Sequence, residues 1–247
     1  MKEDIRALES KINQSAIKCS INWKAVVNSS VRAGISDPSG NCVFIHPKAT
    51  VPETVDINIG GANNLVYIGP HCFIEGGVIE VKGQHGILVI GSRVRTRDGH
   101  IKLSGRKSSV VLGWHTTWGG GQLLASEGEG IFVGDDCMFS SNITIRTSDS
   151  HGIFDRNTGK RLNDARSVFV EDHVWVGNGA RVNKGTRIAR GSVIGQASVV
   201  SGSLLTPSSI YAGVPAKLLR EDIVWSRTGS ISDAPADLLG YATTGEA

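Results

Sequence analysis

The chain has 247 residues, 40% of them hydrophobic but only 6% aromatic, with 31 glycines and a formal net charge of +3. This length predicts one domain with terminal appendages, and so weak a positive charge, without a block of Lys and Arg, argues against nucleic-acid binding. No apolar run approaches the ~18 residues of a membrane span, and the acidic N-terminus is unlike a signal peptide, so we expect a cytoplasmic protein.

Residues 1–40 are predicted to form a helix and a connection. Ile5, Leu8, Ile12 and Ala16 recur at near-helical spacing between charged residues. This pattern indicates a short amphipathic helix that packs on the end of the protein or on a neighbouring subunit. The Ser/Gly-rich residues that follow, up to residue 41, are interpreted as the connection to a regular domain at residues 41–205.

The first part of that domain contains two superimposed repeats. An aliphatic residue returns every sixth position from Ile45 onwards. Four similar segments also end in glycine, and their third residues are Ile68, Ile90, Leu112 and Val133. The steps between these residues are 22, 22 and 21, whereas three hexapeptides account for 18. We therefore expect three or four extra residues at a corner of each coil, in segments such as 82–86 and 127–130.

The six-residue period is clearest between residues 170 and 205. It fits neither the 3.6-residue period of a helix nor the alternation of an ordinary strand, but it is typical of a parallel β-helix, in which each hexapeptide supplies a short strand and a turn. The small residues four positions later leave space at the corners, and Gly177 and Gly195 suit corners because glycine reaches positive φ. The inward-facing aliphatic residues are predicted to be Val170, Val176, Val182, Ile188, Ile194 and Val200.

One insertion interrupts the array. The aliphatic step runs through Val133, Phe139 and Ile145, and the next position in the series is His151. Residues 151–166 are polar and aperiodic, and the periodicity resumes just before Val170. We predict a loop that projects from a rigid scaffold, which is a common place for a functional site.

The repeats, the loop histidine and the sequence Val174-Trp-Val-Gly177 together resemble the hexapeptide-repeat acyltransferases. The similarity is greatest to the branch of galactoside, maltose, xenobiotic and bacterial polysaccharide O-acetyltransferases, and it covers about residues 45–220. It implies an all-β fold: a left-handed parallel β-helix with an extruded catalytic loop at residues 151–166. A short C-terminal helix and a mobile tail would occupy residues 206–247.

The resemblance also implies a reaction. His151 would be the general base that takes the proton from an acceptor hydroxyl while its oxygen attacks the thioester of acetyl-CoA. Histidine suits this task because its side chain titrates close to neutral pH. Trp175 is predicted to stand on an outer face, and the resemblance places it with His151 among the catalytic residues, against the acetyl-pantetheine. The backbone N–H of Asn178 is a candidate oxyanion donor.

Further residues match positions that bind CoA in the family. These lie along the coils and in the sequence from Tyr211 to Arg220, where Lys217 and Arg220 would meet phosphates. The expected cofactor-binding residues are Trp175, Gly177, Asn178, Gly195, Gln196, Ser201, Lys217 and Arg220. No metal is expected.

The implied assembly is a homotrimer with sites between subunits, and the implied acceptor is a sugar hydroxyl of a bacterial capsular or other surface polysaccharide. Galactoside acetyltransferases place asparagines one coil before the histidine, where this chain has Trp118-Gly-Gly-Gly121, so a galactoside is not expected. Alternatives are N-acetylation of an amino-sugar nucleotide, acetylation of an antibiotic, a zinc carbonic anhydrase, which needs three histidine ligands, and a β-helix that serves only for assembly.

Two of the four cysteines, and most histidines other than His151, are interpreted as structural. Cys72 and Cys137 fall on small-residue positions of their repeats, which predicts buried thiols. His115 is a candidate for the acceptor cleft, with a structural role as the alternative. The other histidines are expected at corners or surfaces, namely His46, His71, His85, His100 and His173.

Overall fold

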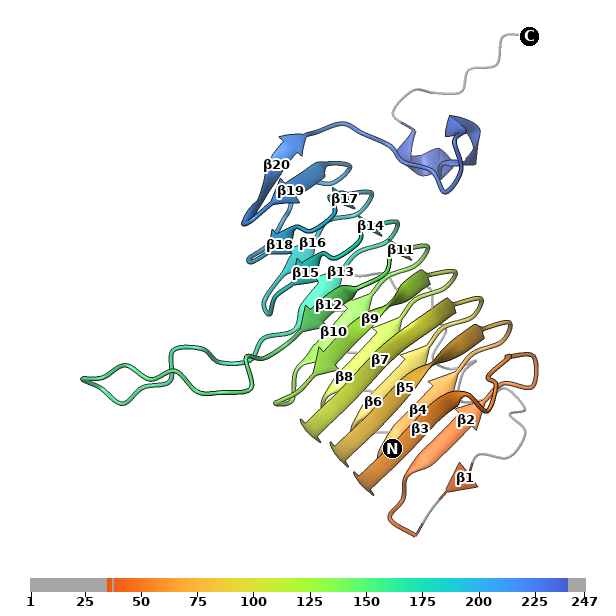
Figure 1. The fold of residues 1–247 in the computed structure, drawn as a ribbon, viewed down its shortest axis with the longest axis vertical. Helices are drawn as coiled ribbons and strands as arrows, with labels where there is room; N and C mark the ends of the chain where they lie inside the picture. Colours follow the sequence, from red (N-terminus) through yellow and green to blue (C-terminus); the bar gives the residue numbers. More distant parts are fainter. Residues whose placement is uncertain (1–34, 37, 240–247) are drawn as a thin grey trace.

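The computed structural model describes residues 35–36 and 38–239, which form a β-solenoid (Figure 1). Strands from successive turns stack in parallel, so each turn of the chain hydrogen-bonds to the next. The predicted N-terminal helix lies outside the described residues. No helix within these residues is long and apolar enough to cross a membrane.

The first face of the solenoid is an eight-stranded sheet. Only its outermost strand, β1, is antiparallel to its neighbour. In spatial order the strands are β1 (Ile35–Ser36), β2 (Cys42–Ile45), β4 (Leu65–Ile68), β6 (Ile87–Ile90), β8 (Ser109–Leu112), β10 (Gly130–Val133), β13 (Val168–Val170) and β16 (Arg187–Ile188).

The second and third faces share a twelve-stranded sheet, because some strands run over the corner between them. Strand β9 shows this directly, since its first residues pair with β11 on the second face and its last residues pair with β12 on the third. Its members are β3 (Val55–Ala62), β5 (Phe73–Gln84), β7 (Arg95–Arg106), β9 (Thr117–Ala125), β11 (Met138–Phe139), β12 (Ile143–Arg146), β14 (Trp175–Val176), β15 (Arg181–Val182), β17 (Val193–Ile194), β18 (Val199–Val200), β19 (Ile210–Gly213) and β20 (Ala216–Arg220).

The six-residue repeat has the structural meaning that the sequence predicts. All six aliphatic residues from Val170 to Val200 are completely buried. The small residues four positions later, from Val174 to Ser198, are completely buried too. Burying one such aliphatic side chain contributes about 1.5–3 kcal/mol, so the stacked residues supply much of the stability.

Gly177 and Gly195 are needed for a reason other than the expected one. Neither has positive φ; the turns use Gly179, Gly185 and Gly191 instead, each with φ of +71°. A Cβ atom at Gly177 would lie 2.6 Å from the backbone nitrogen of Gln196, and one at Gly195 would lie 2.7 Å from the Cβ of Ala212. Close stacking of the next turn therefore excludes a side chain at both positions.

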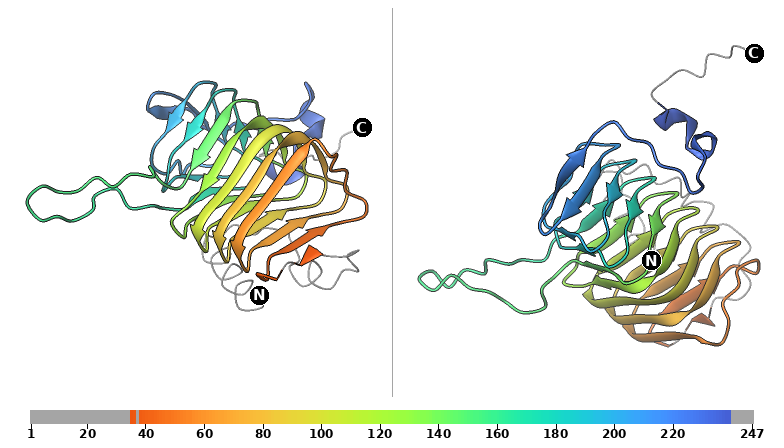
Figure 2. Two further views of the ribbon diagram at one scale, coloured as in Figure 1. Left: turned by 60° about the horizontal axis from the view of Figure 1, so that its bottom comes forward. Right: turned by 45° about the horizontal axis from the view of Figure 1, so that its top comes forward.

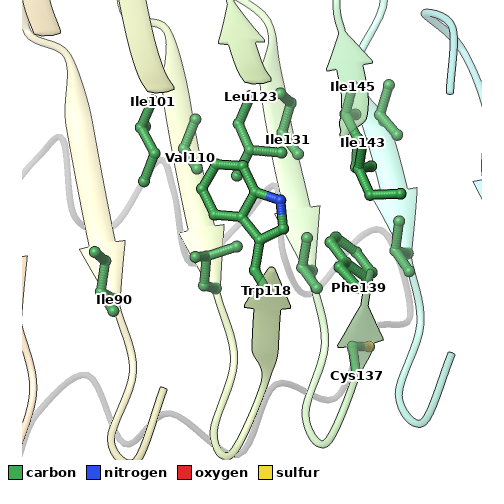
Figure 3. Close-up of a cluster of buried hydrophobic side chains, with 14 of the residues drawn as sticks. Ile90, Ile101, Val110, Trp118, Leu123, Ile131, Cys137, Phe139, Ile143 and Ile145 are labelled. Atoms are coloured by element: carbon green, nitrogen blue, oxygen red, sulfur yellow. The ribbon is translucent and has the colours of Figure 1, made fainter. Parts of the chain in front are cut away.

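The 22-residue steps correspond mainly to longer strands. Strands β5 and β7 are each 12 residues long, and β5 includes residues 82–84, which we had expected at a corner. The expected corner at Glu127 and Gly128 is present as a turn. The wider turns also hold large side chains, and Figure 3 shows Trp118 in the interior. The backbone at Gly99 leaves room for this ring, because a Cβ there would lie 2.4 Å from it.

The predicted C-terminal helix is wrong. Residues 210–220 form the antiparallel strand pair β19 and β20, because β19 adds one more rung to the sheet and buries Tyr211 over the end of the core. The chain then turns back at Val214 and Pro215. Within residues 38–239 the helical segments are two short 3-10 turns, η1 (Ile231–Asp233) and η2 (Ala236–Leu238).

Candidate active site

The insertion forms an arm that projects from the solenoid, as predicted (Figures 1 and 2). It leaves the third face after β12 and returns to the first face at β13. Backbone hydrogen bonds join its two sides, from Leu162 N to Ile153 O at 2.8 Å and from Asp155 N to Lys160 O at 2.8 Å. Ile153, Phe154 and Leu162 are each more than half exposed. The arm therefore presents apolar side chains to its surroundings.

The base of the arm is fixed to the turn that follows it. The Nζ atom of Lys184 lies 2.5 Å from Oδ2 of Asp149 and donates to the carbonyl oxygen of Asn163 at 2.7 Å. The side-chain amide of Asn163 donates to Asp149 and, at 2.8 Å, to the carbonyl oxygen of His151. These hydrogen bonds, from Lys184 first and then from Asn163, lower the pKa of Asp149. The backbone of His151 is thus held in place.

A second contact ties the arm to the preceding turn. Arg161 donates to Glu127 Oε2 at 2.6 Å, and Ser148 donates to the same carboxylate. The pKa of Glu127 is lowered by the bond from Arg161 and then by the bond from Ser148. The carboxylate is therefore ionised at neutral pH and stabilises the arm.

The imidazole of His151 is exposed beside this anchored base. The two acidic residues nearest to His151 in the sequence are engaged elsewhere: Asp149 with Lys184, and Asp155 with the backbone and side chain of Thr158. No hydrogen bond to the ring is made within residues 38–239. The ring is free to approach a substrate.

His151 and Trp175 lie on different faces of the solenoid. Trp175 in β14 pairs with Met138 of β11 and is 37% exposed on the second face, as predicted. The arm that carries His151 follows β12, whose partner Arg181 lies on the third face. One chain therefore does not bring the two predicted catalytic residues together.

Most predicted cofactor-binding residues form a row instead. From Trp175 and Gly177 the row passes to Gly195 in the next turn, then to Ala212 in β19 and to Lys217 in β20. At about 4.8 Å per strand, the row extends roughly 14 Å across strands β14, β17, β19 and β20. Lys217 and Arg220 are exposed at its end, and Asn178 and Gln196 are exposed beside its start. Ser201 lies apart on the third face, where it accepts a hydrogen bond from Asn183 at 2.8 Å.

Known proteins share this architecture. A polysialic acid O-acetyltransferase of Neisseria meningitidis is 35% identical over 178 residues, which are 72% of this chain and 82% of that protein. Another, from Escherichia coli O1:K1 / APEC, is 40% identical over 121 residues, 49% of this chain and 39% of that protein. The structure of the polysialic acid O-acetyltransferase OatWY matches with a TM-score of 0.68 at 32% identity, over 78% of this chain and 90% of that one. No protein-family model matches.

The chain belongs to the hexapeptide-repeat O-acetyltransferases. The membership of this family that the repeats and the loop sequence predicted is confirmed. The polySia-specific acetyltransferase NeuO has the same fold, with a TM-score of 0.52 at 28% identity over 72% of this chain and 91% of that one.

The third face of this O-acetyltransferase contains a groove that sequence reasoning missed. Gly77, Gly99 and Gly121 stack at the corner between the second and third faces. A side chain at Gly77 or Gly121 would collide with the backbone of the next turn, and one at Gly99 would collide with the ring of Trp118. A cavity of about 620 Å³ is lined by these glycines and also by His100 and Arg181. A second cavity of about 340 Å³ shares His100 and Gln122 with the first.

The second cavity leads to the arm, since Ser148 and Ser150 line it together with Arg146 and Lys102. Arg146 and Arg181 make no ion pair within residues 38–239, whereas His100 and Lys102 share Glu80 at 3.1 and 3.8 Å. The groove is therefore most cationic close to His151. The sequence does show which residues of the long strands point outward. It does not show which strands pair with one another, so the groove could not be located from the sequence.

The buried thiols of the acetyltransferase are confirmed. Cys72 and Cys137 are almost completely buried and unpaired, and burial raises the pKa of Cys72 to about 11. His173 lies at a corner, as expected, but it is only 3% exposed, and its Nδ1 lies 2.7 Å from Asp136. His115 contacts the same carboxylate at 2.7 Å, which favours its structural role. No cluster of three potential metal ligands occurs within residues 38–239.

Proposed function

We propose that this enzyme transfers the acetyl group of acetyl-CoA to a hydroxyl of polysialic acid or of a closely similar acidic capsular polysaccharide. The observation that carries the proposal is the 35% identity to a polysialic acid O-acetyltransferase over most of both chains. The position of His151 beside a cationic groove supports it. Because acetyl-CoA is the donor, we place the reaction in the cytoplasm.

In the proposed mechanism, neutral His151 takes the proton of the acceptor hydroxyl while the hydroxyl oxygen attacks the thioester carbonyl carbon. The C–S bond then breaks, the thiolate of CoA leaves, and the imidazolium returns the proton to it. The products are the acetyl ester and CoA. The backbone N–H of Asn178, an exposed residue three positions after Trp175, is the proposed donor to the oxyanion. The row from Trp175 to Lys217 would hold CoA with its phosphates near Lys217.

The same mechanism requires a neighbouring subunit. His151 and Trp175 lie on different faces, and the arm exposes Ile153, Phe154 and Leu162. We infer a homotrimer of left-handed solenoids in which the arm of one subunit brings His151 to Trp175 of the next. Mixing His151→Ala subunits with Trp175→Ala subunits under exchange conditions should restore activity. Two inactive proteins that stay inactive when co-assembled, or a fully active monomer, would contradict this assembly.

The acceptor would lie in the groove of the third face. Polysialic acid has one carboxylate per sugar, and Arg146 and Arg181 provide unpaired positive charges along the groove. An open groove also suits a polymer, which enters and leaves from the side.

The test is to incubate the protein with labelled acetyl-CoA and polysialic acid, and to detect released CoA thiol and O-acetyl groups on the polymer by NMR. A neutral polysaccharide such as dextran is the matched control. Ester formation on polysialic acid alone is expected. Transfer to an amino-sugar nucleotide or an aminoglycoside but not to polysialic acid would overturn the proposal.

A further inference from the structure

The chain continues beyond β20 into a segment that we call the C-terminal strap, residues 221–239. It crosses the end of the solenoid to the side opposite the arm (Figures 1 and 2). There Asp237 forms an ion pair with Arg190 at 2.5 Å. We had expected a mobile tail, but the strap is anchored at several points. Residues 240–247 lie outside the described part of the chain.

Arg227 is the main polar anchor of the strap. Its guanidinium donates to Asp136 Oδ1 at 2.8 Å, to Thr117 Oγ1 at 2.9 Å, and to the carbonyl oxygens of His115 and Cys137 at 3.0 and 2.9 Å. These acceptors belong to two successive turns. Arg227 therefore fixes the strap along the corner that precedes the second face.

Trp225 is clamped next to this anchor. Its ring stacks on His173 with centroids 3.9 Å apart and an interplanar angle of 10°. Its Nε1 donates to the carbonyl oxygen of His173 at 3.0 Å, and His173 Nε2 lies 2.9 Å from the carbonyl oxygen of Trp225. Trp225 is only 6% exposed and His173 3%. Ring and backbone are thus both held by the residue two positions before Trp175.

This clamp places Trp225 beside the candidate donor site. The centroids of Trp225 and Trp175 are 6.0 Å apart, at an interplanar angle of 50°, a favourable arrangement for two aromatic rings. Trp175 remains 37% exposed. Trp225 therefore supports one side of the Trp175 ring and leaves another side open.

We propose that Trp225 is a positioning residue for the acetyl-pantetheine site, and that the C-terminal strap completes this site by holding Trp175 in its binding orientation. The inference rests on the proposed function, in which the thioester end of acetyl-CoA packs against Trp175. A ring that is fixed beforehand does not lose freedom when the ligand binds. Without Trp225, Trp175 would have to be ordered by the ligand itself.

The experiment compares Trp225→Leu and Trp225→Phe with the wild type in steady-state kinetics and in calorimetric binding. Trp225→Leu should raise the KM and the Kd for acetyl-CoA about 3- to 10-fold, with kcat within about two-fold of wild type. Trp225→Phe keeps an aromatic ring and should restore most of the affinity. Adenosine 3′,5′-bisphosphate, the nucleotide end of CoA without pantetheine, should bind all three proteins equally.

Asp237→Asn is the control, because it loosens the far end of the strap without touching either tryptophan. It should leave the KM for acetyl-CoA unchanged. A purely structural role for Trp225 would instead lower the active fraction, and hence the apparent kcat, at an unchanged KM. That result, or equal losses of acetyl-CoA and bisphosphate affinity, would overturn the inference. If wild-type protein does not use acetyl-CoA at all, the proposed function fails and not only this extension of it.

Discussion

The Oδ2 atom of Asp149 lies 2.5 Å from the Nζ atom of Lys184, which ties the start of the arm to the following turn of the solenoid. Lys184 also holds Asn163, whose amide holds the backbone of His151. Removing the ammonium in Lys184→Met should lower kcat about 10- to 100-fold, because small displacements of a catalytic group have effects of this size.

The same substitution should change the free energy of unfolding by on the order of 1 kcal/mol, because water screens Asp149, which is 44% exposed, although the Lys184 side chain is only 16% exposed. Chemical denaturation measures this quantity. Lys48→Met removes an exposed lysine far from the arm and is the control. A variant Lys184→Met with wild-type kcat would show that the anchor does not position His151.

Acid should loosen the arm through two carboxylates. The pKa values of Asp149 and Glu127 are both lowered, by Lys184 and by Arg161 respectively. Groups with a lowered pKa stabilise the fold fully above the ordinary carboxyl value of about 4, and the stabilisation is lost as the pH falls through the lowered values. Hydrogen exchange of the arm, corrected for intrinsic rates, should accelerate below about pH 4. The double variant Asp149→Asn, Glu127→Gln should lack this acceleration in acid. If its hydrogen exchange accelerated as in the wild type, protonation of these two carboxylates would not be the cause.

Local patterns predicted much of this structure. The period of six was sufficient to identify the buried residues from Val170 to Val200, and its interruption located the arm. Pairing across long distances was not predictable in the same way. Arg227 bonds to residues 90 to 112 positions earlier, and no local signal marks its partners. The strand pair β19 and β20 was mistaken for a helix because its pairing depends on the last turn of the solenoid.

The positive charge of the groove should affect the binding of the acceptor polysaccharide and not the binding of acetyl-CoA. Arg146→Glu combined with Arg181→Glu should raise the KM for polysialic acid on the order of 10-fold, because two exposed attractions become repulsions. The KM for acetyl-CoA should not change. Added salt should weaken the wild type more than the variant, since it screens exposed charges. An unchanged KM for the polymer would place the acceptor elsewhere.

Lys217→Ala should raise the KM for acetyl-CoA about 10-fold, the typical value of one charged hydrogen bond, with little change in kcat. The contact is remote from the acetyl group, so it binds ground state and transition state alike. S-acetyl-N-acetylcysteamine, a donor without the nucleotide, is the discriminating substrate and should be used equally by both proteins. Equal losses with the two donors would show that Lys217 does not meet the phosphates.

The most direct test of the account is the rate of acetyl transfer to polysialic acid by His151→Ala, measured alongside its affinity for acetyl-CoA. His46→Ala, which changes a histidine near the N-terminal end of the solenoid, is the control. We predict that kcat of His151→Ala falls about 10²- to 10⁴-fold, while acetyl-CoA binds with wild-type affinity and no acetyl-enzyme accumulates. Near-full activity of His151→Ala, or a stable acetylated residue trapped without acceptor, would contradict direct transfer with His151 as the general base.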